Sequence, residues 1–133
     1  MSNKKETVMD KLPRRMQELV DENVRQGEEI TAIAEGRTGE AVIVTDQRVF
    51  TVNEGEILQA FDKEEITGVK LSRRVRVGRF ELFLENPEKY IVEKSQDDCI
   101  FSPDLSRNVV NFPYIKFPAF QLVEKQINAL IGK

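Results

Sequence analysis

The spacing of apolar residues changes near residue 27, and this change constrains the fold more than any other feature of the sequence. From residue 8 to residue 26, apolar side chains recur every three or four positions, which is the spacing of one helix face. These residues are Val8, Leu12, Met16, Leu19, Val20 and Val24. Beyond residue 27 the apolar residues fall in short, mostly β-branched runs, as in strands. We therefore expect an N-terminal helical extension over residues 1–26, followed by a mainly β structure.

The apolar runs after residue 27 follow one another at short intervals, with no helical segment between them. They are Ile30–Ala34, Ala41–Val44, Val49–Val52, Ile57–Phe61, Ile66–Val75, Val77–Leu84 and Tyr90–Val92. A tight turn at residues 45–48 and breaks near Gly78 and at residues 86–88 separate neighbouring runs. This order predicts an antiparallel meander of six or seven strands. Its apolar face must close into a barrel or pack on a helix.

The last part of the chain combines an irregular segment with a second amphipathic stretch. Residues 95–118 are rich in proline and aromatic residues and show no clear period, so we expect an irregular aromatic insert there. The residues after the insert carry an apolar stripe of Phe120, Val123, Ile127, Leu130 and Ile131. Pro118 suits the first turn of a helix and Gly132 its end. Residues 1–133 therefore form a single domain with a C-terminal helix.

The composition limits the chemistry that this chain can perform. It has 133 residues, no histidine and one cysteine. The usual general base and His-activated nucleophiles are thus missing, and one cysteine cannot build a thiolate metal cage. We expect no catalytic residues, no metal site and no cofactor. The net charge of −3 argues against nucleic-acid binding. Without a signal-like segment or a membrane-spanning apolar run, we expect a cytoplasmic protein.

Three local motifs, in this order and spacing, resemble the bacterial pleckstrin-homology-like (PH-like) domains. They are Gly27-Glu28-Glu29, Thr45-Asp46-Gln47-Arg48-Val49, and Phe61 followed by acidic residues and Ile66-Thr67-Gly68-Val69. The resemblance covers residues 27–94 and 118–131, and residues 95–117 depart from it. It implies a bent antiparallel sheet or partly open barrel of about seven strands, capped by the C-terminal helix, with the N-terminal helix as an addition. It also implies binding and not catalysis.

A run of basic residues is the first candidate site. Lys70, Arg73, Arg74, Arg76 and Arg79 lie between residues 66 and 80, a segment without any acidic residue. Converging guanidinium groups can bind a lipid headgroup or a phosphorylated ligand. The alternative is a solvated hairpin whose arginines pair with Glu81 and Glu85. Strand alternation would place Arg73 and Arg74 on opposite faces.

The aromatic insert is the second candidate site. Phe101, Phe112, Tyr114 and Phe117 are aromatic residues of the kind that protein interfaces use. The alternative is that they complete the core of the domain itself. The N-terminal helix leaves the same choice open, because its apolar stripe can pack on its own sheet or on a partner.

Two functions follow from these candidate sites. The first is a non-catalytic PH-like interaction domain that binds a protein partner, through self-association into a homo-oligomer. The second is peripheral binding of an anionic membrane surface or a phosphorylated ligand through the basic hairpin. Charge reversal at Arg74 and Arg76 should abolish the second activity, whereas changes at Phe112 or Tyr114 should affect the first.

Overall fold

The computed structural model describes residues 12–53, 57–86 and 108–133. The described part contains the α-helices α2 (Arg14–Asn23) and α3 (Phe117–Leu130) and the short 3-10 helices η1 (Lys63–Glu65) and η3 (Tyr114–Lys116). Its strands are β1 (Ile30–Glu35), β2 (Ala41–Thr45), β3 (Arg48–Asn53), β4 (Ile57–Asp62), β5 (Ile66–Arg74), β6 (Val77–Leu84) and β7 (Val109–Pro113). None of the helices in this part is long and apolar enough to cross a lipid bilayer.

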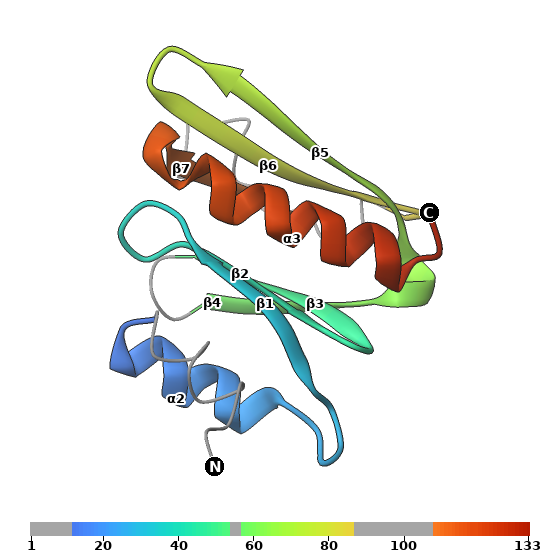
Figure 1. Ribbon diagram of the computed structural model, residues 1–133. Coiled ribbons are helices and arrows are strands. Elements are labelled where there is room, and N and C mark those ends of the chain that lie inside the picture. The colour runs from blue at the N-terminus through green and yellow to red at the C-terminus, as the bar shows by residue number, and fades with distance from the viewer. Residues whose placement is uncertain (1–11, 54–56, 87–107) are drawn as a thin grey trace, which may run out of the picture.

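The strands form two antiparallel sheets (Figure 1). One has the order β1-β2-β3-β4 and the other the order β5-β6-β7. The chain passes from the first sheet to the second through η1, directly after β4. The β strands in each sheet follow the sequence order, as expected for a meander. The mainly β fold class is confirmed: about seven strands in two bent sheets, two flanking helices, and no closed barrel among the described residues.

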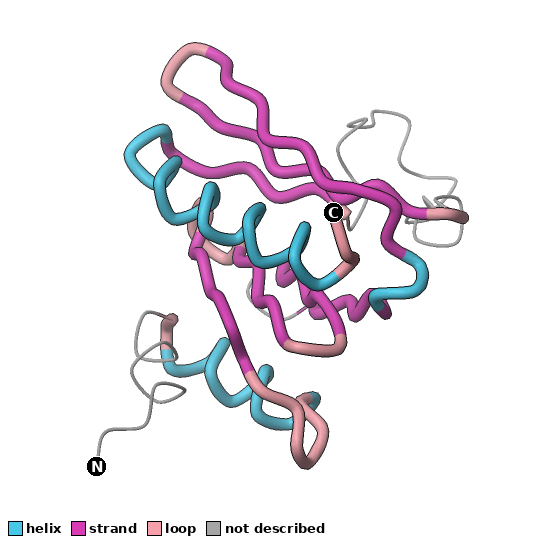
Figure 2. Tube along the Cα trace, turned by 45° about the vertical axis from the view of Figure 1, so that its right-hand side comes forward, coloured by secondary structure: helices cyan, strands magenta, loops and turns pink. Residues whose placement is uncertain are grey.

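Helix α3 lies along the opening between the two sheets (Figure 2). Its residues Phe120, Val123 and Ile127 are fully buried, as the period of the stripe predicts. They share one core with Val42, Val44 and Phe61 of the first sheet and with Phe80, Leu82 and Phe112 of the second. The helix therefore buries an apolar face of each of the two sheets.

Helix α2 covers the opposite face of the four-stranded sheet. Leu12, Met16 and Val20 form a second apolar cluster with strand residues that include Ile33, Ile43 and Phe50. The helix begins after Pro13 and ends at Asn23, so it is shorter than the apolar period suggests, and residues 8–11 lie outside the described residues. The described part of the N-terminal stripe thus packs on the chain's own sheet.

The break that the sequence suggested near Gly78 is wrong. The turn between β5 and β6 is at Val75 and Arg76, and Gly78 lies inside β6, opposite Phe112 of β7. A Cβ atom at residue 78 would lie only 2.1 Å from Cε2 of Phe112. The glycine is therefore needed because an aromatic ring packs against the strand, not because the chain turns there.

The prediction of an irregular segment is wrong over residues 109–118. Residues 109–113 form β7, η3 follows, and α3 begins at Phe117 with Pro118 in its first turn. Pro113 is tolerated in a strand because it ends β7, which is an edge strand. The predicted strand Tyr90–Val92 and residues 95–107 of the insert lie outside the described residues.

Candidate anion-binding site at the hairpin apex

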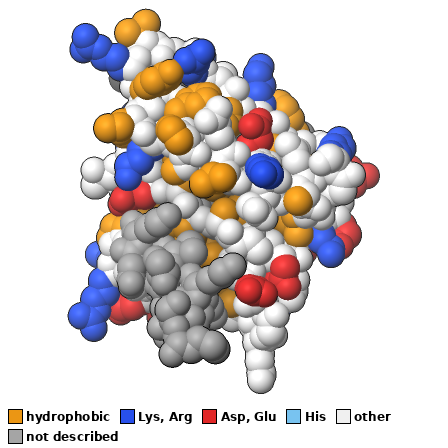
Figure 3. Space-filling view, in the orientation of Figure 1, with side chains coloured by type: hydrophobic (Ala, Val, Ile, Leu, Met, Phe, Trp, Pro, Cys, Tyr) orange, Lys and Arg blue, Asp and Glu red, His pale blue; other side chains and the backbone are white. Residues whose placement is uncertain are grey.

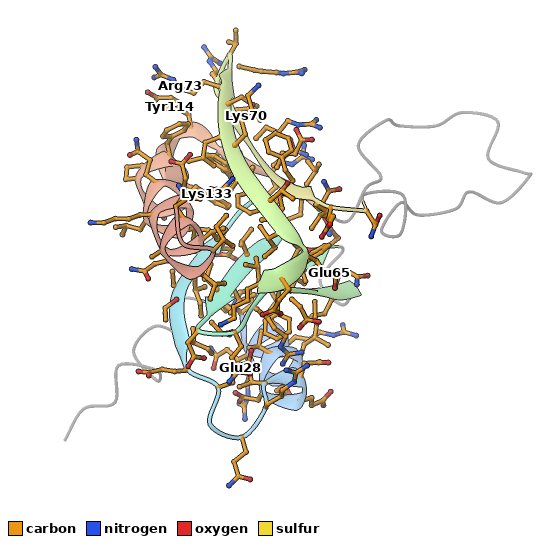
Figure 4. The ribbon with its side chains drawn as sticks, turned by 90° about the vertical axis from the view of Figure 1, so that its right-hand side faces the viewer. Glu28, Glu65, Lys70, Arg73, Tyr114 and Lys133 are labelled. Atoms are coloured by element: carbon orange, nitrogen blue, oxygen red, sulfur yellow. The ribbon has the colours of Figure 1, made fainter. Side chains whose placement is uncertain are left out.

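The β5–β6 turn and η3 together form a small platform, which we call the apex and define as residues 73–76 and 113–115. Two hydrogen bonds join its halves. The backbone N–H of Tyr114 donates to the carbonyl oxygen of Arg76 over 3.2 Å. Nη1 of Arg73 donates to the phenolic oxygen of Tyr114 over 2.6 Å. Segments distant in sequence are thus held side by side, with Arg73 and Tyr114 adjacent in Figure 4.

The surface of the apex is an open, shallow hollow. All seven residues of the apex line it, from Arg73 to Arg76 and from Pro113 to Ile115. Its aliphatic side chains are strongly exposed: Val75 by 87% and Ile115 by 82%. Hydrophobic and basic side chains lie next to each other at this end of the molecule (Figure 3). The hollow therefore combines positive charge with apolar surface.

Three of the five predicted basic residues lie at the apex, on different sides of it. Arg73 pairs with Gly78 in the ladder and Arg74 with Val77, so strand alternation places them on opposite faces, as the sequence indicated. The guanidinium carbon of Arg73 lies 5.5 Å from the ring centre of Tyr114 and 5.7 Å from that of Phe117. These contacts, within cation–π range, hold Arg73 in place. Arg74 and Arg76 are exposed and form no ion pair with any other described residue.

The other two basic residues lie further along the ladder. Lys70 is opposite Glu81, and Nη2 of Arg79 is 3.9 Å from Oε1 of the same glutamate. Arg79 is thus partly neutralised, as the alternative interpretation of the basic run proposed. The structure therefore divides the run into an apex group of Arg73, Arg74 and Arg76 and a neighbouring group around Glu81.

The turn at the apex has unusual residues for its geometry. Arg76 has a φ of 61°, in the left-handed region, and it is the one non-glycine residue of the described part with a positive φ. Two-residue hairpin turns favour Asn-Gly, Asp-Gly or Gly-containing pairs, because glycine and asparagine adopt positive φ at low cost. An arginine at residue 76 is therefore a costly choice for the turn alone. Departures from local rules of this kind concentrate at functional positions.

The aromatic candidates do not form one surface patch. Phe112 is fully buried, and its ring stacks on that of Phe120 with a 3.9 Å separation between ring centres. Phe117 is half-buried and packs against the same core. Tyr114 is 46% exposed and belongs to the apex. Phe101 lies outside the described residues.

A second charged cluster lies at the β2–β3 turn of the four-stranded sheet, where Glu28 and Arg48 are buried together. Nε and Nη2 of Arg48 donate to the two carboxylate oxygens of Glu28 over 2.9 and 2.6 Å. The hydroxyl of Thr45 donates to the same carboxylate over 2.6 Å, and the backbone N–H of Arg25 donates over 2.9 Å. Arg48 also donates to the carbonyl oxygen of Asn23 at the end of α2. The pair therefore ties the helix to the β2–β3 hairpin.

These contacts set the charge state of the pair. Burial alone would raise the pKa of Glu28, but hydrogen bonds from Arg48, Thr45 and the Arg25 backbone, together with the charge of Arg48, outweigh it and lower the pKa to about 2. The hydrogen bond to Glu28 raises the pKa of Arg48 further above its ordinary value, against the opposing effect of burial. Both groups are thus ionised at neutral pH. Because both carboxylate oxygens of Glu28 accept hydrogen bonds from within the chain, this cluster stabilises the fold.

Two features of these sites were missed in the sequence. The motifs at residues 27–29 and 45–49 stood out as a pattern, but nothing in their order showed that Glu28 and Arg48 form an ion pair. Val75 was assigned to a strand, and Ile115 to an irregular segment. The available signal was the absence of Gly, Asn or Asp between two strand-like runs at residues 74–77.

The apex offers guanidinium groups, one phenol and aliphatic side chains, which suit recognition of an anion. In the described part of the chain, no cluster of three or more Asp, Glu or Cys residues could hold a metal ion. In comparisons with known proteins, no family model, no curated protein and no solved structure matches this chain.

Proposed function

We propose that this chain is a non-catalytic, PH-like binding domain that takes an anionic ligand at the apex. The observation that carries the proposal is the position of Arg74 and Arg76, two exposed guanidinium groups without an ion-pair partner among the described residues. The third arginine of the apex, Arg73, lies on the other face of the strand from Arg74 and is held by its hydrogen bond to Tyr114. Guanidinium groups present several N–H donors in a fixed plane and bind phosphate-type oxygens well.

The arrangement of the apex favours an anion over an aromatic protein interface. Phe112 and Phe117 contribute to the core, which leaves Tyr114 as the exposed aromatic residue of the described candidates. Around Tyr114 the hollow is lined by arginines and by no acidic residue. Charge complementarity therefore directs this surface toward a negatively charged ligand. In the cytoplasm, the location expected from the sequence, the negative inner leaflet of the membrane is one such ligand.

The test is a double charge reversal at the apex. The variant Arg74→Glu/Arg76→Glu is offered two probes, vesicles containing phosphatidylglycerol and soluble inorganic polyphosphate. A basic residue near an anionic surface contributes about 1 kcal/mol, so losing two should weaken vesicle binding by about 30-fold or more. The effect should shrink when salt is raised from about 0.1 M to about 1 M, because the screening length falls from about 10 Å to about 3 Å.

The matched control changes the net charge equally at exposed residues away from the apex. Arg14→Glu/Lys63→Glu places one reversal on α2 and one on η1. This control should bind both probes much like the wild type. Equal losses in the two double variants would mean that overall charge, and not the apex, determines binding. Light scattering tests self-association: a stable homo-oligomer unaffected by the apex reversal, with no binding to either probe, would favour a protein-binding function instead.

A further inference from the structure

The two most exposed large hydrophobic side chains of the described residues lie at the apex. Val75 occupies the β5–β6 turn and Ile115 the middle of η3, and both line the same hollow. A single exposed aliphatic residue is ordinary in a folded protein. Two that come from distant segments and line one hollow, together with three arginines, require an explanation.

The local structure presents these side chains to the surroundings. The hydrogen bond from the Tyr114 N–H to the Arg76 carbonyl holds η3 against the turn. In Figure 1 the β5–β6 turn projects past the N-terminal end of α3, so the apex is a protrusion of the molecule. Val75 and Arg76 form the two-residue turn, and the positive φ of Arg76 is a conformation that Gly or Asn adopts at lower cost.

An aliphatic tip surrounded by guanidinium groups matches the chemistry of a bilayer surface. The acyl chains begin just below the phosphate groups, so a shallowly inserted side chain lies next to the charged oxygens. Long basic side chains reach those oxygens while their aliphatic parts remain in the apolar region. A soluble phosphate would use the arginines of the apex but would leave Val75 and Ile115 in water.

We propose that the apex inserts Val75 and Ile115 into the interface of an anionic bilayer, while Arg73, Arg74 and Arg76 contact the lipid phosphates. This inference rests on the proposed anionic ligand and commits it to a lipid surface. The bound orientation follows directly: the hairpin tip and η3 face the membrane. Helix α2, on the far face of the four-stranded sheet, faces away from it (Figure 1).

The first experiment measures binding of Val75→Ser/Ile115→Ser to phosphatidylglycerol vesicles and to inorganic polyphosphate. Both side chains are exposed, so these changes should leave the fold intact, which circular dichroism and the unfolding midpoint will show. Losing the inserted methyl and methylene groups should weaken vesicle binding by about tenfold or more. Polyphosphate binding should change by less than about twofold. Phe83→Ser is the matched control, because Phe83 is 40% exposed and lies at the opposite end of β6.

The second experiment reports insertion directly. The chain contains no tryptophan, so the variant Val75→Trp introduces a single indole at the tip. Its emission should shift to shorter wavelength on anionic vesicles and be quenched by lipids brominated along the acyl chain. Phe83→Trp places the same reporter away from the tip and should show neither effect.

The outcomes separate this inference from the proposed function. A loss of vesicle binding in the serine variant, with quenching at residue 75 and not at residue 83, supports insertion. Arginine-dependent binding of both probes without any effect of Val75 and Ile115 would overturn the inference and leave the proposed function standing. The same holds if polyphosphate binds and vesicles do not. Failure of both probes, or a dimer that the serine variant dissociates, would overturn both.

Discussion

The molecule uses arginine in two regions, and the surroundings decide what each arginine does. Arg48 is buried, and its donors are taken by both carboxylate oxygens of Glu28 and by the Asn23 carbonyl. Arg74 and Arg76 at the apex are exposed and have no acidic partner among the described residues. The first region obtains its anion from within the chain. The second offers the same chemistry to an anion from outside it.

The contrast also explains why charge runs in a sequence are difficult to interpret. Arg48, which stands alone in the sequence, forms a buried ion pair with Glu28. Arg74 and Arg76, which stand in a basic cluster, form no ion pair with any described residue. The role of an arginine depends on whether folding places a carboxylate within hydrogen-bond distance of it, and that carboxylate can be far away in the sequence. The Glu28–Arg48 pair and the apex can be compared by removing arginines one at a time.

Removal of Arg48 should have the largest effect on stability. Arg48→Met leaves the Glu28 carboxylate buried without its counter-charge, and breaking a buried pair in this way costs about 3 to 5 kcal/mol. Urea unfolding should show this loss in the midpoint. Arg74→Met at the exposed apex should change the free energy of unfolding by less than about 0.5 kcal/mol. Equal effects at the two positions would contradict the distinction between the two regions.

A double variant sharpens this result. In Glu28→Gln/Arg48→Met no unpaired charge remains buried, so part of the stability lost in Arg48→Met should return. A double variant less stable than Arg48→Met would mean that the pair does not act as a unit.

Acid should weaken the Glu28–Arg48 cluster. Burial raises the pKa of Glu28, but the hydrogen bonds from Arg48 and Thr45 outweigh it, and the pKa falls from its ordinary 4.5 to about 2. A carboxyl group with a lower pKa in the folded state stabilises the fold fully above its unfolded pKa, and this contribution is lost as the pH falls through the folded value. About 3 kcal/mol should therefore disappear between about pH 4.5 and pH 2. Unfolding curves of Glu28→Gln should lack this component.

The smallest expected effect is at the turn itself. Arg76→Gly removes a side chain from a left-handed backbone position, which should stabilise the protein by about 1 kcal/mol. The same variant should bind anionic vesicles about fivefold less tightly, because one basic residue is lost. Arg74→Gly is the matched control: it lies in the strand, where glycine should destabilise by about 0.5 to 1 kcal/mol. An Arg76→Gly variant that is less stable than the wild type would exclude strain at the turn.

The sequence predicted the parts of the fold that depend on local patterns. The strand runs, the turn at residues 45–48 and the stripe of α3 all appear near their expected positions, because alternation and helical spacing directly reflect burial. The errors arose where a distant contact determines the local structure. Gly78 indicated a turn, yet it is there to admit the ring of Phe112. Strand β7 was missed because prolines and aromatic residues concealed a short edge strand.

The candidate site was predictable to a similar degree. The basic residues were evident, and strand alternation correctly separated Arg73 from Arg74. The sequence could not show that Tyr114 holds Arg73 or that Ile115 and Val75 line one hollow, because η3 reaches the hairpin only through the folding of β7 beside β6. Composition thus indicated the kind of ligand, and only the tertiary structure brought together the surface that would bind it.

The close packing of Phe112 over Gly78 has a consequence for how this hairpin could change over time. The ring stacks on Phe120 in the core and packs against the hairpin at Gly78, two residues after the exposed turn. The turn residues themselves are exposed and outside the core. The side chains at the tip could therefore be replaced, naturally or by engineering, to direct the domain to a different surface, while the packing of Phe112 against Gly78 and Phe120 stays unchanged.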